Sequence, residues 1–291
     1  MNTIRRHLRQ TLLLPLILVS AFGVCANAQQ SASSAGPPQS SPQRAAGETP
    51  ESAPVKILTN FVEAGGSYEQ LSDNFGRWSG GYFRSAITTG KNTWNAELNG
   101  QHEFGDAGTY MDAGDTYAIN SDWYAALTLG SSVGGFFWPR SRVDAFVNRK
   151  WLERKQLITT LGFGYDHARD VHSDHSVFIG TTYYFEKPWI VEDGIRFNIS
   201  SPSVVFASSG FIAVTEGQNK QRYVTLNVGI GEEAYQLVGS ATILTRFPSQ
   251  TATLTWRQWV GKNWGFDLVA DFYHSPYYHR GGGSFGLFKE F

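Results

Sequence analysis

The chain has 291 residues, with 24 basic and 25 acidic side chains and a formal net charge of −1. This balance excludes the basic surface that nucleic-acid binding requires, so no nucleic-acid partner is expected. The single cysteine, Cys25, excludes a disulfide within the chain.

Residues 1–28 are predicted to be a signal peptide. Three arginines lie within the first nine residues, an apolar stretch runs from Leu12 to Val24, and small residues lead to a cleavage site after Ala28. The apolar stretch is shorter than the ~20 residues of a transmembrane helix, and no later stretch exceeds it. If the mature chain lies in a membrane, it must cross as a closed sheet. Cys25 is removed with the signal peptide, which leaves no thiolate to bind a metal.

Residues 29–55 are rich in Ser, Pro and Gln and contain no aromatic residue, which predicts a disordered periplasmic spacer. Aromatic residues and glycines dominate residues 56–291. There, apolar residues alternate with polar or small ones, as Val224, Leu226 and Val228 do. This two-residue period predicts an all-β, antiparallel up-and-down transmembrane barrel. The nine tryptophans are expected mostly near strand ends, where aromatic girdles meet the membrane interfaces.

About fourteen strands are expected, an even number as single-chain bacterial barrels have, with twelve or sixteen as alternatives. Tight turns at 89–91, 120–121, 187–188, 217–220 and 261–262 fall on one rim, which we assign to the periplasm. Longer outer loops are expected at 132–139, 167–174, 232–248 and 274–281. The predicted strands are 58–68, 76–88, 92–104, 108–119, 122–131, 140–149, 156–166, 175–186, 189–199, 207–217, 221–231, 249–260, 263–273 and 282–291.

The last segment has the pattern that the outer-membrane barrel assembly machinery reads. Phe285, Leu287 and Phe291 share one face. Lys289 departs from this pattern, but its long stem can carry the charge to the headgroups. The barrel is therefore expected in the bacterial outer membrane, in contact with lipid and lipopolysaccharide.

Three stretches carry a family resemblance: Arg222 to Ala234, Thr255 to Trp259, and Tyr277 to Phe291. Together they resemble the YaiO family of outer-membrane barrels, over most of residues 58–291. Some relatives carry helical repeats before the barrel, where this chain has its Ser/Pro-rich spacer. The resemblance implies location and fold more than activity.

Strand alternation places charges of both signs on the inner face, so neither sign of ion is favoured. One interpretation is a network of paired charges that fills the lumen. The other is a narrow polar pore lined by Arg142, Arg196, Arg257 and Asp267. The charged residues expected inside are Arg84, Glu97, Glu103, Arg142, Asp144, Glu192, Arg196, Arg257, Asp267 and Asp271.

The segment 166–175 holds three histidines and three aspartates, a composition that can bind a divalent ion. Its spacing matches no established metal motif, so His167, His172 and His175 are weak candidates, and neither a metal nor another cofactor is expected. A serine hydrolase is a further alternative, because Ser173 and Ser275 lie beside histidines. Adjacent residues on a strand point to opposite faces, however, and Gly-x-Ser-x-Gly is absent.

The sequence therefore favours a narrow channel or transport component for small solutes or glycans, without enzymatic activity. The alternatives are a structural or surface-interaction barrel with a filled lumen, and an outer-membrane enzyme that modifies lipid or lipopolysaccharide.

Overall fold

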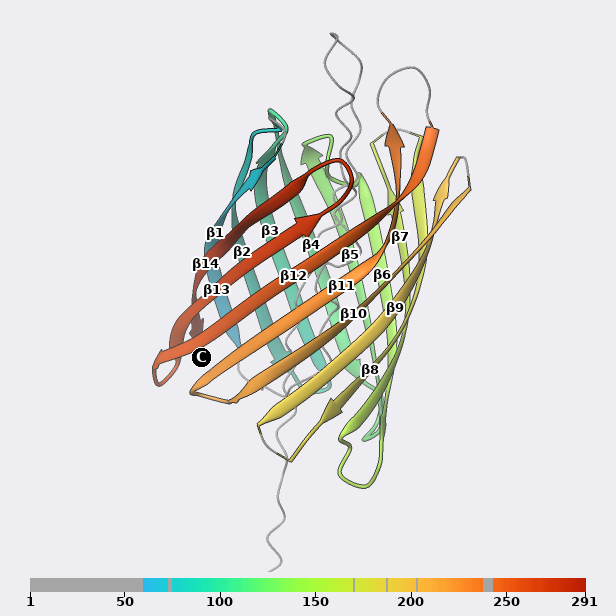
Figure 1. Cartoon of the computed structure of the whole chain (residues 1–291). Coiled ribbons are helices and arrows are strands. Elements are labelled where there is room, and N and C mark those ends of the chain that lie inside the picture. The colour runs from blue at the N-terminus through green and yellow to red at the C-terminus, as the bar shows by residue number, and fades with distance from the viewer. Residues whose placement is uncertain (1–59, 73–74, 170, 187, 203, 238–242) are drawn as a thin grey trace, which may run out of the picture.

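A computed structural model describes residues 60–72, 75–169, 171–186, 188–202, 204–237 and 243–291. The predicted signal peptide and spacer lie outside these residues. Fourteen antiparallel strands form a closed barrel, in which each strand pairs with the next and β14 pairs with β1 (Figure 1). The predicted all-β fold and its fourteen strands are thus confirmed. The strands are β1 (Phe61–Leu71), β2 (Arg77–Thr89), β3 (Asn92–Glu103), β4 (Asp106–Ala118), β5 (Trp123–Gly134), β6 (Ser141–Trp151), β7 (Leu157–His167), β8 (Ser173–Tyr184), β9 (Trp189–Ser201), β10 (Val205–Gln218), β11 (Arg222–Leu237), β12 (Ile243–Gly261), β13 (Trp264–His274) and β14 (His279–Glu290).

Within the described ranges, no helix is long and apolar enough to cross a membrane.

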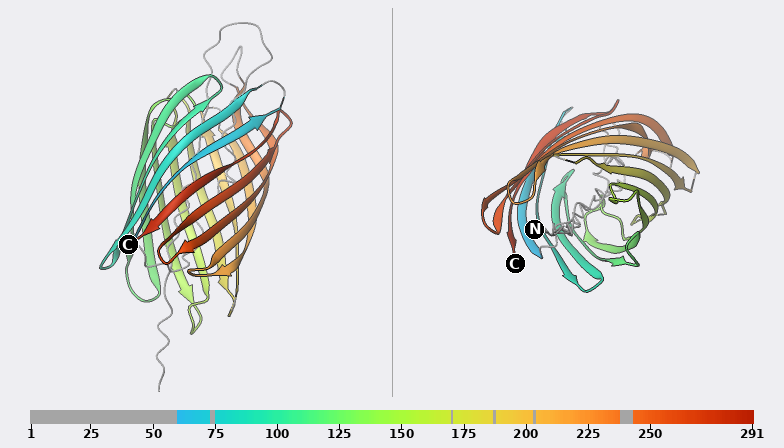
Figure 2. Two further views of the ribbon diagram at one scale, coloured as in Figure 1. Left: turned by 90° about the vertical axis from the view of Figure 1, so that its left-hand side faces the viewer. Right: turned by 90° about the horizontal axis from the view of Figure 1, so that it is seen from below.

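The wall has an apolar outer face and a polar inner face, because successive side chains of a strand point to opposite sides. On β11, Leu226 and Val228 are exposed on the outside, whereas Asn227 between them is buried. The strands are tilted across the wall, which closes into a ring when seen from below (Figure 2). Tilt of this kind is required to close a sheet into a barrel.

Both ends of the barrel lie at one rim, where β1 begins and β14 ends; we call it the terminal rim and the other the opposite rim. Connections are two to five residues long at the terminal rim and two to six at the opposite rim. The four predicted outer loops coincide with connections at the opposite rim, but their predicted lengths were wrong, because the connections are shorter. The clearest case is 232–248, where β11 and β12 stay paired up to Leu237 and Ile243. The β11–β12 ladder continues beyond residue 231, where the clear alternation of apolar and polar residues ends.

Seven of the nine tryptophans fall into two groups, and the other two, Trp94 and Trp256, are exposed on the outside further along their strands. One group lies on the outside at the terminal rim, and each member is the first or last residue of its strand: Trp123, Trp151, Trp189 and Trp264. This is the position of an interfacial girdle. The expectation was wrong for Trp78, Trp138 and Trp259, which are buried on the inside.

Candidate functional site

One row of residues runs along the inner wall from rim to rim. Each member lies directly opposite the next in the strand ladders, and strand tilt makes the row climb the wall. It begins at Trp259 near the terminal rim and ends at Ser200 near the opposite rim. We call it the charged row. Its members in order are Trp259, Gly265, Phe288, Glu63, Arg84, Glu97, Asp112, Gly130, Arg142, Asp166, Asp174 and Ser200.

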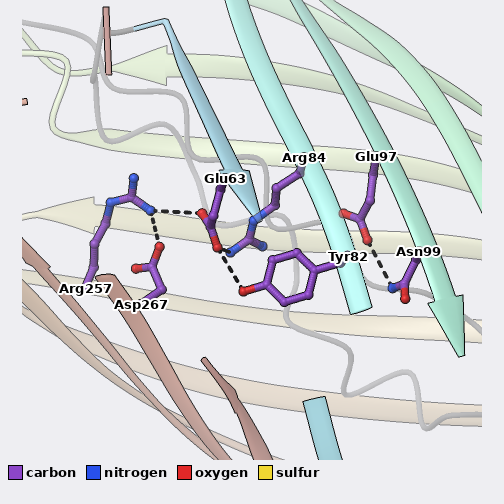
Figure 3. A network of polar contacts seen from close by, with 7 residues as sticks. All are labelled: Glu63, Tyr82, Arg84, Glu97, Asn99, Arg257 and Asp267. Carbon is purple, nitrogen blue, oxygen red and sulfur yellow. Dashed lines mark hydrogen bonds and ion pairs between the residues drawn. The ribbon is translucent and has the colours of Figure 1, made fainter. Parts of the chain in front are cut away.

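Near the terminal rim, five residues form a balanced ionic network, the arginine–carboxylate cluster (Figure 3). Arg84 donates to Glu63 Oε1 over 2.6 Å, and the Tyr82 hydroxyl donates to the same oxygen over 3.0 Å. Arg257 Nη1 lies 3.5 Å from Glu63 Oε2 and 2.6 Å from Asp267 Oδ2. Two carboxylates therefore meet two guanidinium groups.

The cluster is anchored by burial and by aromatic rings. Glu63 is only 1% exposed. The Arg257 guanidinium carbon lies 3.7 Å from the centre of the Phe288 ring and 5.3 Å from that of Trp259. A delocalised cation is stabilised by such ring faces. Because buried charges persist only when paired, this cluster holds together β1, β2, β12 and β13.

Beyond Glu97 the charged row becomes acidic. Asp112 lies opposite Glu97 in the β3–β4 ladder, and Asp166 lies opposite Asp174 in the β7–β8 ladder, so like charges face each other at two places in the row. Arg142 is the one base of this stretch; its Nε lies 2.5 Å from Asp144 Oδ2 and 3.7 Å from Asp166 Oδ1. This part of the wall therefore carries more negative than positive charge.

The four residues expected to line a pore all lie on the inner face, but they do not form one group. Arg257 and Asp267 belong to the arginine–carboxylate cluster, and Arg142 belongs to the acidic stretch. Arg196 Nη1 lies 3.0 Å from Ser176 Oγ on the neighbouring strand.

Sequence reasoning missed several inner charges. Asp166 and Asp174 were assigned to a loop and its ends, although they pair in the β7–β8 ladder. Glu233 was assigned to an outer loop, but it is buried and accepts a hydrogen bond from Tyr273 at 3.1 Å. Asp112 lies within the predicted strand 108–119 and is buried on the inner face of β4. Strand parity continued to the observed strand ends would have found them.

A second arginine site lies near the opposite rim. Arg280 Nε is 3.0 Å from Glu69 Oε2, and Arg280 Nη2 is 3.7 Å from Asp271 Oδ2. Its guanidinium carbon lies 4.8 Å from the centre of the Trp78 ring. The same combination of carboxylates and an aromatic face thus buries a cation at both ends of the barrel.

Aromatic rings gather at the opposite rim, where they form what we call the aromatic cap. Phe104 is central, with ring centres 5.0 Å from Trp78, 6.4 Å from Phe75 and 6.3 Å from Phe136. Phe104 and Gly105 form the β3–β4 turn with φ of 50° and 82°, the left-handed conformation that tight hairpins need. The cap comprises Phe75, Trp78, Phe104, Tyr110, Phe136, Phe137, Trp138, Tyr273 and Tyr278.

The three candidate histidines for a metal site do not come together. His172 is buried, whereas His175 is exposed with its ring centre 4.9 Å from that of Tyr165. Across the described residues, no group of three or more His, Cys, Asp or Glu side chains could hold a metal ion.

The considered hydrolase arrangement also does not form around Ser275. Its Oγ accepts the backbone N–H groups of Tyr277 at 3.2 Å and Tyr278 at 3.4 Å, so the hydroxyl stabilises the β13–β14 turn. His274 and His279 stack on each other, with Nδ1 atoms 2.5 Å apart. A nucleophile needs a base within reach, and here both histidines contact each other instead.

A closed barrel with an apolar outer face, an interfacial girdle and a charged inner wall defines an integral outer-membrane protein. The chain belongs to the YaiO family, because the YaiO membrane beta barrel domain matches residues 59–236. Of the stretches that carried the resemblance, Arg222 to Ala234 lies within this match and the other two lie beyond it. No curated protein matches the chain in sequence.

Solved structures with a similar fold include two outer-membrane channels and a further outer-membrane protein. The CymD monoaromatic hydrocarbon channel has a TM-score of 0.58 at 6% identity, over 81% of this chain and 89% of that one. An outer-membrane channel from Pseudomonas putida F1 has a TM-score of 0.50 at 8% identity, over 81% and 96%. Omp33 from Acinetobacter baumannii has a TM-score of 0.50 at 8% identity, over 80% and 99%. At such identities the likeness concerns the fold alone.

Proposed function

We propose that this barrel is a narrow outer-membrane channel for small hydrophilic solutes or glycans, with no catalytic activity. The observation that carries the proposal is the charged row, which extends from Trp259 near one rim to Ser200 near the other. Ionisable side chains placed step by step across a membrane offer a hydrated solute repeated polar contacts. The channels with a similar fold are consistent with this function.

In this proposal, Arg142, Arg196, Arg257 and Asp267 line the pathway. Arg257 is 13% exposed at its side chain and Arg142 is 10% exposed, so both side chains retain some contact with solvent. A guanidinium held in place by carboxylates is a fixed positive charge that a polar solute meets on the inner wall.

The test is single-channel conductance of the chain purified from outer membranes, in planar lipid bilayers. We expect reproducible conductance steps whose size changes in Arg142→Ala. The matched control is Arg222→Ala, because Arg222 is exposed at the start of β11 and pairs only weakly with Glu216, at 3.5 Å. Steps of the same size in all three proteins would contradict a pathway along the inner wall.

A second function is a structural or surface-interaction barrel with a filled lumen. The aromatic cap favours it, because rings from four connections or their flanking strands pack together at the opposite rim. A folded, heat-modifiable barrel that gives no conductance would reject the channel and favour this alternative.

The proposal also includes export and placement. A signal peptide cleaved after Ala28 would deliver the chain to the periplasm, and the assembly machinery would recognise Phe285, Leu287 and Phe291. The terminal rim would then face the periplasm, with lipid and lipopolysaccharide against the outer wall. Mass spectrometry of the mature N-terminus tests the cleavage site.

A further inference from the structure

We infer that the channel passes cations in preference to anions. This inference rests on the proposed channel function and names its class of solute. It comes from the charge balance and the hydrogen bonding of the inner wall, which the sequence alone had left neutral between the two signs.

Acidic side chains outnumber basic ones inside the described barrel. Twelve acidic residues are buried, against the two bases Lys150 and Arg280. Seven partly exposed or rim residues are added to these: Asp106 and Asp271 of the inner face, Lys220, which pairs with Glu290, and Arg84, Arg142, Arg196 and Arg257. The sum is fourteen acids and seven bases. The buried acids are Glu63, Glu69, Glu97, Glu103, Asp112, Asp144, Asp166, Asp174, Glu192, Glu233, Asp267 and Glu290.

The excess is concentrated away from the arginine–carboxylate cluster, where two arginines balance two carboxylates. From Glu97 to Asp174 the charged row holds four acids and one base, Arg142. Arg142 lies closest to Asp144, which lies outside the row. The acidic stretch therefore keeps a net negative charge.

Asp112 provides an independent indication of a ligand. Its side chain is buried, the residue being 8% exposed, and its Oδ1 atom has no hydrogen-bond partner. The charges that act on Asp112 include those of Glu97, Arg142 and Asp144, so two of these three are negative. A buried carboxylate oxygen without a donor is costly unless a cation or water approaches it. The carboxylate is thus suited to a passing cation.

Rings and rows of Asp and Glu select cations because their field raises the local cation concentration and repels anions. Low-dielectric walls concentrate this field within the lumen. Small monovalent cations such as K⁺ need no fixed ligand cage to pass along such a wall.

The test is the reversal potential of the full chain in planar bilayers under a KCl gradient. We expect the potential to lie on the K⁺ side of zero. Asp112→Asn and Glu97→Gln should each shift it towards zero, and two independent variants guard against a folding defect in one. The matched control is Asp115→Asn, because Asp115 is on the same strand but pairs with Trp94 on the outward face.

Conducting channels with a potential at zero or on the Cl⁻ side would overturn the inference and leave the proposed channel intact. A shift in Asp115→Asn as large as in Asp112→Asn would overturn the assignment to the inner wall. A folded barrel without conductance would overturn both the inference and the proposed function.

Discussion

Asp112 lies directly opposite Glu97 in the β3–β4 ladder, so two carboxylates of neighbouring strands face each other on the inner wall. One step further along the charged row, Glu97 faces Arg84, which donates its closest hydrogen bond to Glu63 on the other side. The Arg84 guanidinium therefore binds Glu63, on the far side of Glu97 from Asp112.

Neutralising Asp112 should stabilise the barrel. Like charges directly opposite in a ladder are destabilising, so Asp112→Asn is expected to raise the free energy of unfolding by about 0.2–1 kcal/mol. Urea unfolding of the barrel in lipid vesicles measures it. The outward Asp115→Asn serves as the control, and a lower stability of Asp112→Asn would contradict the repulsion.

Removing the charge of Arg257 should have the opposite effect. Arg257→Met leaves Glu63 and Asp267 without one of their cations, and breaking a buried pair costs about 3–5 kcal/mol. The control is Arg222→Met, since Arg222 has a side chain that is 57% exposed and a surface pair that contributes no more than about 1 kcal/mol. Equal losses in the two variants would contradict a buried cluster.

A charge on the outer face should be tolerated at a rim but not at mid-membrane depth. Leu226 lies outward on β11, opposite Val214 and Leu254 of the two neighbouring strands and away from both rims. We assign it to mid-membrane depth, so Leu226→Arg should cost about 2–4 kcal/mol. Val133, beside the end of β5, should tolerate Val133→Arg at a cost of about 0–1 kcal/mol. Unfolding in vesicles compares the two, and similar costs would contradict the assigned depth.

The aromatic cap should contribute strongly to stability. Trp138 is 0% exposed, and its ring centre stacks 5.0 Å from that of Tyr110. Truncating a buried tryptophan costs about 3–5 kcal/mol, so Trp138→Ala should lower stability by this amount. Trp264→Ala at the outer girdle is the matched control, and we expect a smaller loss there.

An ion pair between two connections at the terminal rim, Asp122 with Lys155, should set the pKa of the Asp122 carboxyl. A hydrogen bond from Lys155 holds the pKa of Asp122 below its ordinary value of 3.8. Because the pKa of Asp122 is lower in the folded state than in the unfolded state, its ion pair stabilises the fold at pH values above the unfolded-state pKa. This stabilisation is lost as the pH falls through the folded-state pKa. Lys155→Ala should therefore raise the Asp122 pKa towards 3.8 in an NMR titration. Arg154→Ala removes the neighbouring pair with Glu186 and should leave Asp122 unchanged.

The sequence predicted the barrel and its strand number because alternation is a local signal repeated fourteen times. It predicted the inner position of Arg257 and Asp267 for the same reason. It did not reveal that Glu63 joins them, because Glu63 and Arg257 are 194 residues apart and meet only when the barrel closes. The register of each ladder decides which charges become neighbours, and alternation alone does not fix it.

The aromatic cap was missed for a different reason. Trp78 and Trp138 lie near strand ends, as girdle residues do, and composition does not distinguish a ring that faces lipid from one that folds over the mouth. Trp78 faces inward by its position on β2, and Trp138 lies in the β5–β6 connection, where its backbone N–H donates to the Gly135 carbonyl over 3.1 Å.

The contact between Arg257 of β12 and Glu63 of β1 has a consequence for how the barrel is completed. The two residues lie on either side of the seam where β1 meets β14, and Glu63 pairs with Phe288 across it. A two-residue slip of this seam would set Glu63 opposite either Gly286 or Glu290, and the second arrangement opposes two carboxylates. Until the seam closes correctly, Glu63 does not contact Arg257, and Arg257 has only Asp267 as a partner. The barrel thus carries a chemical check on its last strand pairing, so a wrongly closed ring is destabilised by its own carboxylates.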